Sequence, residues 1–159
     1  NHTVVFSPGS GTSTEVQNEL KTLSDNSGGR YYAICKGEKF EKSNTWESRP
    51  FFDDYETLVR SSDLIFVGTR FDHRVSNVAY DALRYGKPVV LFDCPFARLL
   101  HADYPSMVFP INNVRDIPDV KIDHVRIAVE HSRFIKKHSF SALMTALRPI
   151  LRDAKKNWC

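Results

Sequence analysis

The amino-acid sequence predicts an α/β protein with a Rossmann-like, mostly parallel sheet and helices on both faces of that sheet. Two uninterrupted apolar runs, LIFV at 64–67 and VVLF at 89–92, are typical of strands buried on both sides. Between them lies one helix with clear end signals: Ser76 is a good N-cap, Gly86 suits a left-handed C-terminal position, and Pro88 prevents continuation. Strand, helix and strand in this order form a βαβ unit, so we expect parallel strands with a right-handed crossover.

The N-terminal part of the chain shows the same alternation of strand and helix. Residues 3–6 (TVVF) predict the first strand. A capping box from Thr12 to Glu15 predicts a helix that runs to about Leu23. After a turn, residues 30–35 (RYYAIC) predict a second strand.

The next segment is polar at first and then regains local structure signals. Residues 38–48 are charged and have no clear period, so we expect a loop there. Residues 49–52 predict a short strand. Asp53, with Glu56 three residues later, forms a second capping box that opens a helix through Arg60.

After the βαβ unit the chain breaks into short pieces. Prolines at 95, 105, 110 and 118 argue against a long helix, so we expect a helical turn near 97–101 and a strand near 107–109. From Asp119 onward the pattern is helical, with one helix over 122–129. Ser139 caps a last helix, kinked at Pro149, whose inward residues are expected to be Phe140, Leu143, Met144, Leu147 and Leu151.

The βαβ unit places a helix N-terminus and its preceding loop at the carboxyl edge of the sheet, where ligands bind in open α/β folds. The helix opens with free amides around Ser76 and Asn77, which favour an anion, and Asp81 lies one turn further along the same face. Asp81 is therefore placed to accept hydrogen bonds from sugar hydroxyls. The alternative is a solvated loop before an ordinary capped helix. The loop side chains concerned are Thr69, Arg70, Asp72 and His73.

A glycine-containing loop, SPGSG, follows the first predicted strand. Gly9, Ser10 and Gly11 lie between a strand and a helix, a position from which backbone amides can cradle phosphate. The loop lacks the Lys of a P-loop and the third Gly of a dinucleotide-binding fingerprint, so both motifs are excluded. A plain tight turn is the alternative interpretation.

The stretch TRFDHRVSNVAYDALRYGKPVVLFD resembles the donor-binding segment of group 1 glycosyltransferases with the GT-B fold. That family has a strand, an S-R-[YF]-[ED] loop, S-N-V or an equivalent, an acidic residue followed by Ala, and a G-x-P-V-V turn. The resemblance is specific over 51–95, and RFIKKHSFSALMTALRPIL also looks like the family's closing segment. It implies that residues 1–159 are a single nucleotide-sugar-binding domain, the C-terminal half of a two-domain enzyme.

The resemblance also implies roles for individual residues. The amides of Ser76, Asn77 and Val78 would hold the donor pyrophosphate, and Asp81 would bind the nucleotide ribose. Asp72 matches the first acid of the family's paired-glutamate motif, which lies near the donor sugar. In this chain both acids are Asp rather than Glu, and one extra residue separates them.

The activity implied by the resemblance is transfer of a sugar from a UDP- or GDP-linked donor to an acceptor hydroxyl in polysaccharide or glycolipid synthesis. Arg70 and the helix amides would stabilise charge on the leaving diphosphate. Arg70 and Asp72 are thus the catalytic candidates, with His73 facing the phosphate or solvent. The glycine loop would approach the donor phosphates or the acceptor, and Lys36 would supply the positive charge that relatives carry just after the first strand.

The missing N-terminal domain would carry the acceptor site, so we expect this chain alone to bind donor weakly and not to catalyse transfer. Two other functions stay open. One is a non-catalytic nucleotide-binding module, which the Asp-for-Glu changes favour. The other is a small nucleoside-processing enzyme similar to a deoxyribosyltransferase, against which the spacing of SNVxxD argues.

Composition excludes several classes of protein. Hydrophobic residues make up 42% and charged residues 26% of the 159 residues, as in ordinary globular domains, and no apolar run approaches the ~20 residues that span a bilayer. A net charge of +3 with scattered basic residues does not support nucleic-acid binding. The sequence does not begin with Met, so we expect a processed product or part of a longer protein.

Cysteine and histidine spacings argue against disulfides and metals. The three cysteines are widely spaced, which favours a reduced, cytoplasmic setting. His124, His131 and His138 recur every seven residues, about 10 Å apart on a helix, too far for one metal ion. We therefore expect no metal and no cofactor besides the donor. Basic pairs at 136–137 and 155–156 leave open a peripheral contact with the inner membrane face.

Overall fold

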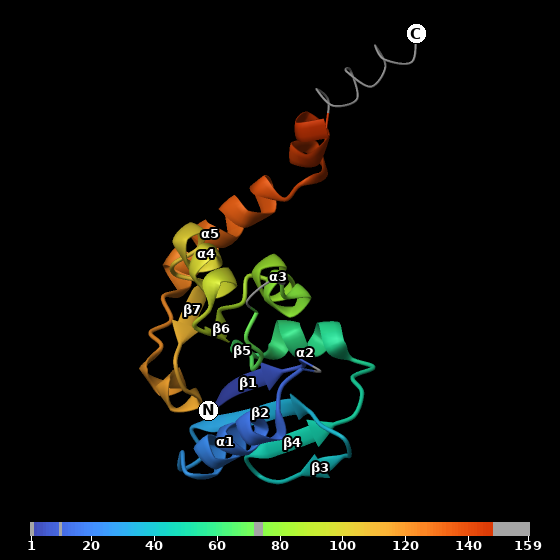
Figure 1. Ribbon diagram of the computed structural model, residues 1–159, viewed down its shortest axis with the longest axis vertical. Coiled ribbons are helices and arrows are strands. Elements are labelled where there is room, and N and C mark those ends of the chain that lie inside the picture. The colour runs from blue at the N-terminus through green and yellow to red at the C-terminus, as the bar shows by residue number, and fades with distance from the viewer. Residues whose placement is uncertain (1, 10, 72–74, 148–159) are drawn as a thin grey trace.

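The computed structural model describes residues 2–9, 11–71 and 75–147 (Figure 1). Its centre is one seven-stranded sheet in the order β3-β4-β2-β1-β5-β6-β7. Every neighbouring pair is parallel except the antiparallel pair of β3 and β4. The strands are β1 (Thr3–Ser7), β2 (Tyr31–Lys36), β3 (Glu41–Lys42), β4 (Trp46–Arg49), β5 (Leu64–Val67), β6 (Val89–Phe92) and β7 (Val108–Ile111).

Helices cover both faces of this sheet, and each face has its own apolar cluster. One face packs against α2 (Tyr55–Ser61), α3 (Asn77–Arg84), α4 (Pro95–Asp103) and α5 (His124–Lys137). The other packs against α1 (Thr14–Asp25) and the 3₁₀ helix η1 (Val114–Asp119). The predicted fold class, a Rossmann-like and mostly parallel sheet between two helical layers, is confirmed.

The chain reverses its direction across the sheet between β1 and β5. From β1 it proceeds through β2 to β4 on one side, and from β5 it proceeds through β6 to β7 on the other. Strands β1 and β5 are nonetheless direct parallel neighbours, with Val5 opposite Leu64 and Phe6 opposite Ile65. This arrangement is the topological switch point of a doubly wound sheet, where ligands of such folds bind beyond the carboxyl ends of the strands.

The predicted βαβ unit is confirmed as β5, α3 and β6. The Ser76 hydroxyl accepts a hydrogen bond from the Ala79 amide at 3.2 Å, which is the N-cap contact expected from the sequence. Gly86 has φ of 67°, the left-handed conformation that ends the helix. Strand β6 pairs in parallel with β5. Local signals therefore define this unit.

The expectation of a loop over 38–48 is wrong. Strand β4 occupies its end, and a two-residue antiparallel strand, β3, lies beside β4. Glu47 is buried within β4 because Tyr32, Lys42 and Arg49 all contact its carboxylate. Because β4 buries a charged residue, its sequence lacks the alternation of apolar and polar residues that indicates a strand. The strand could therefore not be predicted from this pattern. The short strand expected at 49–52 contributes only Arg49.

Helix starts are shifted from the predicted residues. Helix α1 is capped by Ser13, whose hydroxyl accepts from the Val16 amide at 3.3 Å, because Thr12 is buried between two loops. Helix α2 begins after Asp54 with no side-chain cap, so the capping box at Asp53 is not formed.

The last two helices form an extension that we call the C-terminal arm: α5 and the helix over 140–147. Figure 1 shows this arm leading away from the sheet. Phe140 and Leu143 were expected to point inward, yet they are 76% and 54% exposed because no other element of the described structure packs against them. Leu151 and Pro149 lie outside the described residues. No described helix combines the length and the apolar character needed to cross a bilayer.

Candidate functional site

The loops that follow β1 and β5 contact each other at the switch point. A Cβ atom added to Gly11 would lie 2.9 Å from the Thr69 hydroxyl oxygen. One added to Gly68 would lie 2.6 Å from the Thr12 methyl carbon. Both distances are shorter than real Cβ contacts, so glycine is needed where these loops approach. Gly11 and Thr69, both predicted site residues, are thus brought together, with Gly9 in the same loop.

A hollow of about 330 Å³ opens beside these two loops on the α1 face of the sheet. The predicted residue Arg70 lies on its wall, and its guanidinium carbon is 5.5 Å from the centre of the Phe92 ring at the end of β6. The next residue after Phe92, Asp93, forms an ion pair with Arg98 at 2.7 Å and not with Arg70. The hydrogen bond from Arg98 lowers the pKa of Asp93. The other lining residues are Gly11, Ser13, Glu15, Val16, Glu19, Gly68, Thr69, Asn112 and Asn113.

A second hollow, of about 510 Å³, lies on the other side of the α1 N-terminus. Lys36, at the carboxyl end of β2, lines it together with Ser13, which lines the first hollow as well. Its other two lysines, Lys21 and Lys39, both pair with Glu41, at 3.7 and 3.2 Å. Within the described part of the chain, Lys36 has no such ion pair. The α1 N-terminus therefore lies between a hollow with Arg70 and a hollow with Lys36.

Helix α3 begins at the same edge but on the opposite face of the sheet from α1. Ser76 is buried, and its hydroxyl accepts a hydrogen bond from the Ala79 amide, so its side chain caps α3. The amides of Asn77 and Val78 come before the first intrahelical donor, so they lack acceptors within α3. Asn77 is exposed and Val78 is half-buried. These free amides and the helix dipole favour an anion beyond α3.

Asp81 is half-buried, and its carboxylate accepts a hydrogen bond from the Tyr55 hydroxyl at 2.9 Å. Tyr55 is the first residue of α2, and the sequence analysis did not identify it. Burial and the hydrogen bond to Asp81 raise the pKa of Tyr55 above its usual value. The phenol therefore stays protonated and donates. No local sequence signal marks Tyr55, because the contact depends on how α2 and α3 lie beside each other.

Three predicted site residues cannot be placed. Ser10, Asp72 and His73 lie outside the described residues. The placed residues group at one edge of the sheet but on two faces: Arg70 and Lys36 flank α1, whereas Asp81 lies between α2 and α3. The edge thus offers cations and free amides for an anion, and a carboxylate for hydroxyl groups.

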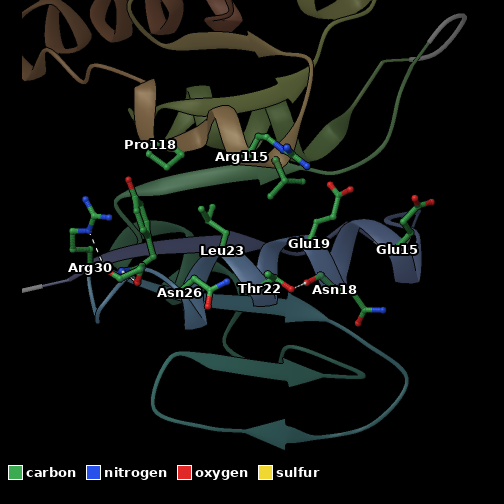
Figure 2. Close-up of a pocket in the computed structure, with 12 residues that line it drawn as sticks. Glu15, Asn18, Glu19, Thr22, Leu23, Asn26, Arg30, Arg115 and Pro118 are labelled. Carbon is green, nitrogen blue, oxygen red and sulfur yellow. Dashed lines mark hydrogen bonds between the residues drawn. The ribbon is translucent and has the colours of Figure 1, made fainter.

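A larger hollow of about 720 Å³ lies elsewhere, between α1 and η1 (Figure 2). Figure 2 shows that it follows α1 from Glu15 near the carboxyl edge to Arg30 beyond the far end of the helix. Its middle is apolar, with Leu23 and Pro118 on opposite walls. None of the predicted site residues lines it, although Glu15 and Glu19 line both this hollow and the smaller one that contains Arg70.

Among the described residues, neither a metal site nor an accessible thiol is found. Over 2–9, 11–71 and 75–147, no three His, Cys, Asp or Glu side chains are grouped to hold a metal ion. Cys35 and Cys94 are free and buried, and burial raises the pKa of Cys35. The Cys94 sulfur accepts a hydrogen bond from the Ala97 amide at 3.5 Å and so caps α4. Both cysteines serve packing and capping.

Comparisons with known proteins find similarity among solved structures. No family model matches the chain, and no curated protein matches its sequence. Among solved structures, the chain is similar to the apo form of the glycosyltransferase GlyE from Streptococcus pneumoniae TIGR4, with 15% identity and a TM-score of 0.39. The match covers 58% of this chain and 25% of that one, so this chain spans about a quarter of that protein. At this similarity, function has to be judged from the chain's own residues.

Proposed function

We propose that this chain is the nucleotide-sugar-binding half of a GT-B glycosyltransferase and that the donor lies at the carboxyl edge between β1 and β5. One observation carries the proposal. The segment that resembles the donor-binding segment of group 1 enzymes folds as β5, α3 and β6 at the switch point, with free amides at the start of α3 and Asp81 one turn further. Phosphate and sugar recognition thus have separate groups a few residues apart.

The donor diphosphate is the anion that this edge suits best. Free amides at α3, the N-terminus of α1, Arg70 and Lys36 all supply positive potential there. Arg70 and Lys36 are the candidates for stabilising charge on the leaving diphosphate, as electrostatic groups aimed at a developing anion do. Gly9, Ser10 and Gly11 supply the backbone of the loop that approaches the phosphates.

The sugar-facing side of the donor is assigned to carboxylates. Asp81 is assigned to the ribose hydroxyls, and Asp72 is assigned to the transferred sugar from its position in the sequence alone. The acceptor site belongs to an N-terminal domain, so the isolated chain binds donor and leaves it intact. The donor is a UDP- or GDP-linked sugar. Turnover of such a donor by the purified chain alone would contradict this division of labour.

The direct test is calorimetric titration of the wild-type chain and Asp81→Ala with UDP, GDP and UDP-sugars. A hydrogen bond to a charged group contributes about 1.5–3 kcal/mol, so Asp81→Ala should weaken nucleotide binding about ten- to hundredfold. Asp119→Ala is the matched control, because Asp119 is an exposed acid at the end of η1. If the folded wild type binds no nucleoside diphosphate at millimolar concentration, the proposed function is wrong.

The C-terminal arm supports a peripheral contact with the inner membrane face in the cytoplasm. Val125, Val129 and Phe140 are 77%, 67% and 76% exposed, and Lys136 is exposed as well. Residues 124–147 carry four basic side chains and one acidic side chain. Exposed apolar and basic groups along this arm suit an anionic lipid surface.

Vesicle co-sedimentation tests this contact. The chain should sediment with phosphatidylglycerol vesicles and not with neutral phosphatidylcholine vesicles. Lys136→Glu should weaken the binding at least about fivefold, because each basic residue near an anionic surface contributes about 1 kcal/mol. Equal sedimentation with both vesicle types, or with neither, contradicts the contact.

A further inference from the structure

A hydrogen bond between Tyr55 and Asp81 joins helices α2 and α3. The Tyr55 hydroxyl donates to Oδ2 of Asp81 at 2.9 Å across 26 positions of sequence. Tyr55 opens α2, and Asp81 lies one turn into α3. Both helices begin after strands whose carboxyl ends form the ligand-binding edge, so the pair lies close to that edge.

The Tyr55 ring is held in place by aromatic packing. Its centre lies 5.9 Å from that of Phe6, which is fully buried in β1. Phe6 is in turn packed edge-on against Phe52 at 5.0 Å. A ring fixed in this way presents its hydroxyl in one direction, so the hydrogen bond has a rigid donor.

The Asp81 carboxylate is only partly used by this contact. An ionised carboxylate has about four acceptor positions on two oxygens, and Tyr55 takes one of them on Oδ2. The remaining positions are free to accept two neighbouring hydroxyl groups of a ribose. A carboxylate whose rotation is already restricted loses less conformational freedom when a ligand binds.

We propose that Tyr55 is a positioning residue for ribose recognition: its hydroxyl holds the Asp81 carboxylate in the orientation that accepts the ribose hydroxyls. This inference rests on the proposed function, because it needs a nucleoside diphosphate in the site. Because Tyr55 acts through Asp81, its hydroxyl affects recognition of the sugar of the nucleotide and not of its phosphates.

The test is Tyr55→Phe, which keeps the aromatic ring and removes only the hydroxyl. Wild type and variant are titrated calorimetrically with UDP, GDP, their 2′-deoxy and 3′-deoxy counterparts, and inorganic pyrophosphate. The variant should bind the preferred ribonucleotide about three- to tenfold more weakly, as expected for one lost hydrogen bond. Its affinity for pyrophosphate should not change, and its preference for ribose over deoxyribose should shrink by the same factor.

Tyr31→Phe is the matched control. Tyr31 begins β2 at the amino end of that strand, opposite to the carboxyl edge that holds the candidate site, so its hydroxyl should not affect nucleotide affinity. Melting temperatures of all variants show whether the fold is kept. A loss of ribose selectivity is the decisive readout, because general loosening of the site would weaken pyrophosphate and nucleotide alike.

Each outcome separates the inference from the function on which it rests. If the folded wild type binds neither UDP nor GDP, the proposed function fails and the inference falls with it. If wild type binds nucleotide and Asp81→Ala weakens it while Tyr55→Phe does not, only the role of Tyr55 is refuted. If Tyr55→Phe weakens pyrophosphate as much as UDP, the hydroxyl supports the site as a whole, and the assignment to ribose is wrong.

Discussion

Gly68→Ala is predicted to destabilise the protein at the switch point between β1 and β5. The added Cβ atom would lie 2.6 Å from Thr12 Cγ2 and 3.1 Å from Val16 Cγ1. Carbon atoms pack at about 3.5–4.0 Å, so Thr12 would have to move by roughly 1 Å. Thr12 is only 8% exposed and has little room to move. Overpacking of this kind costs about 1–3 kcal/mol, which lowers Tm by about 4–8 °C for a 2 kcal/mol loss.

The cause of that loss can be isolated with a second substitution. Thr12→Ser removes the methyl group nearest the new Cβ atom and keeps the hydroxyl, so it should restore most of the lost stability in the Gly68→Ala background. Urea denaturation of the wild type, both single variants and the double variant gives the coupling energy, expected to be about 1 kcal/mol or more in favour of the pair. If the two single effects simply add, the crowding is not with Thr12 and the described loop packing is wrong.

Three further predictions concern buried or charged side chains. Glu130→Gln should lower the free energy of unfolding by about 1–3 kcal/mol in urea denaturation, because its carboxylate accepts the amides of Ser106 and Met107, and an amide side chain cannot replace all three bonds. Burial alone would raise the pKa of Glu47, but hydrogen bonds, foremost from Arg49, lower it below 4.5. The stability that ionised Glu47 contributes is therefore complete above pH 4.5 and is lost as the pH falls through its lower pKa in the folded state. Glu47→Gln should flatten the acid side of a plot of unfolding free energy against pH. Lys36→Ala should weaken pyrophosphate binding measured by calorimetry at low salt, whereas no effect would remove Lys36 from the site.

The elements that the sequence predicts well are those with local signals. An apolar run, Ser76 as N-cap and Gly86 in a left-handed conformation lie within one short stretch, and they define β5, α3 and β6. Strand β4 has no such signal, because the polar Glu47 is buried by partners from other parts of the chain. A pattern in one stretch does not reveal contacts that are made by another.

The same distinction applies to the candidate site. Gly11, Thr69, Arg70 and Asp81 were predicted as candidates from loop and helix positions. In the structure the first three line one hollow, and Asp81 contacts Tyr55 on the other face of the sheet. Tyr55 was missed because its contact with Asp81 depends on the packing of α2 against the sheet. The capping role of Thr12 was wrongly predicted for a related reason: the next residue caps α1 while Thr12 fills the space between two loops.

The two edges of the sheet determine how this protein can associate with others. At one edge, β3 has only two residues, Glu41 and Lys42, and both carry charge. At the other, β7 contains Pro110, which has no amide hydrogen to donate to a further strand. Short, charged or proline-containing edges resist pairing with strands of another molecule. Growth of the sheet from chain to chain is therefore disfavoured at both edges, so the described part of the chain is better suited to assemble through its helical layers or its loops.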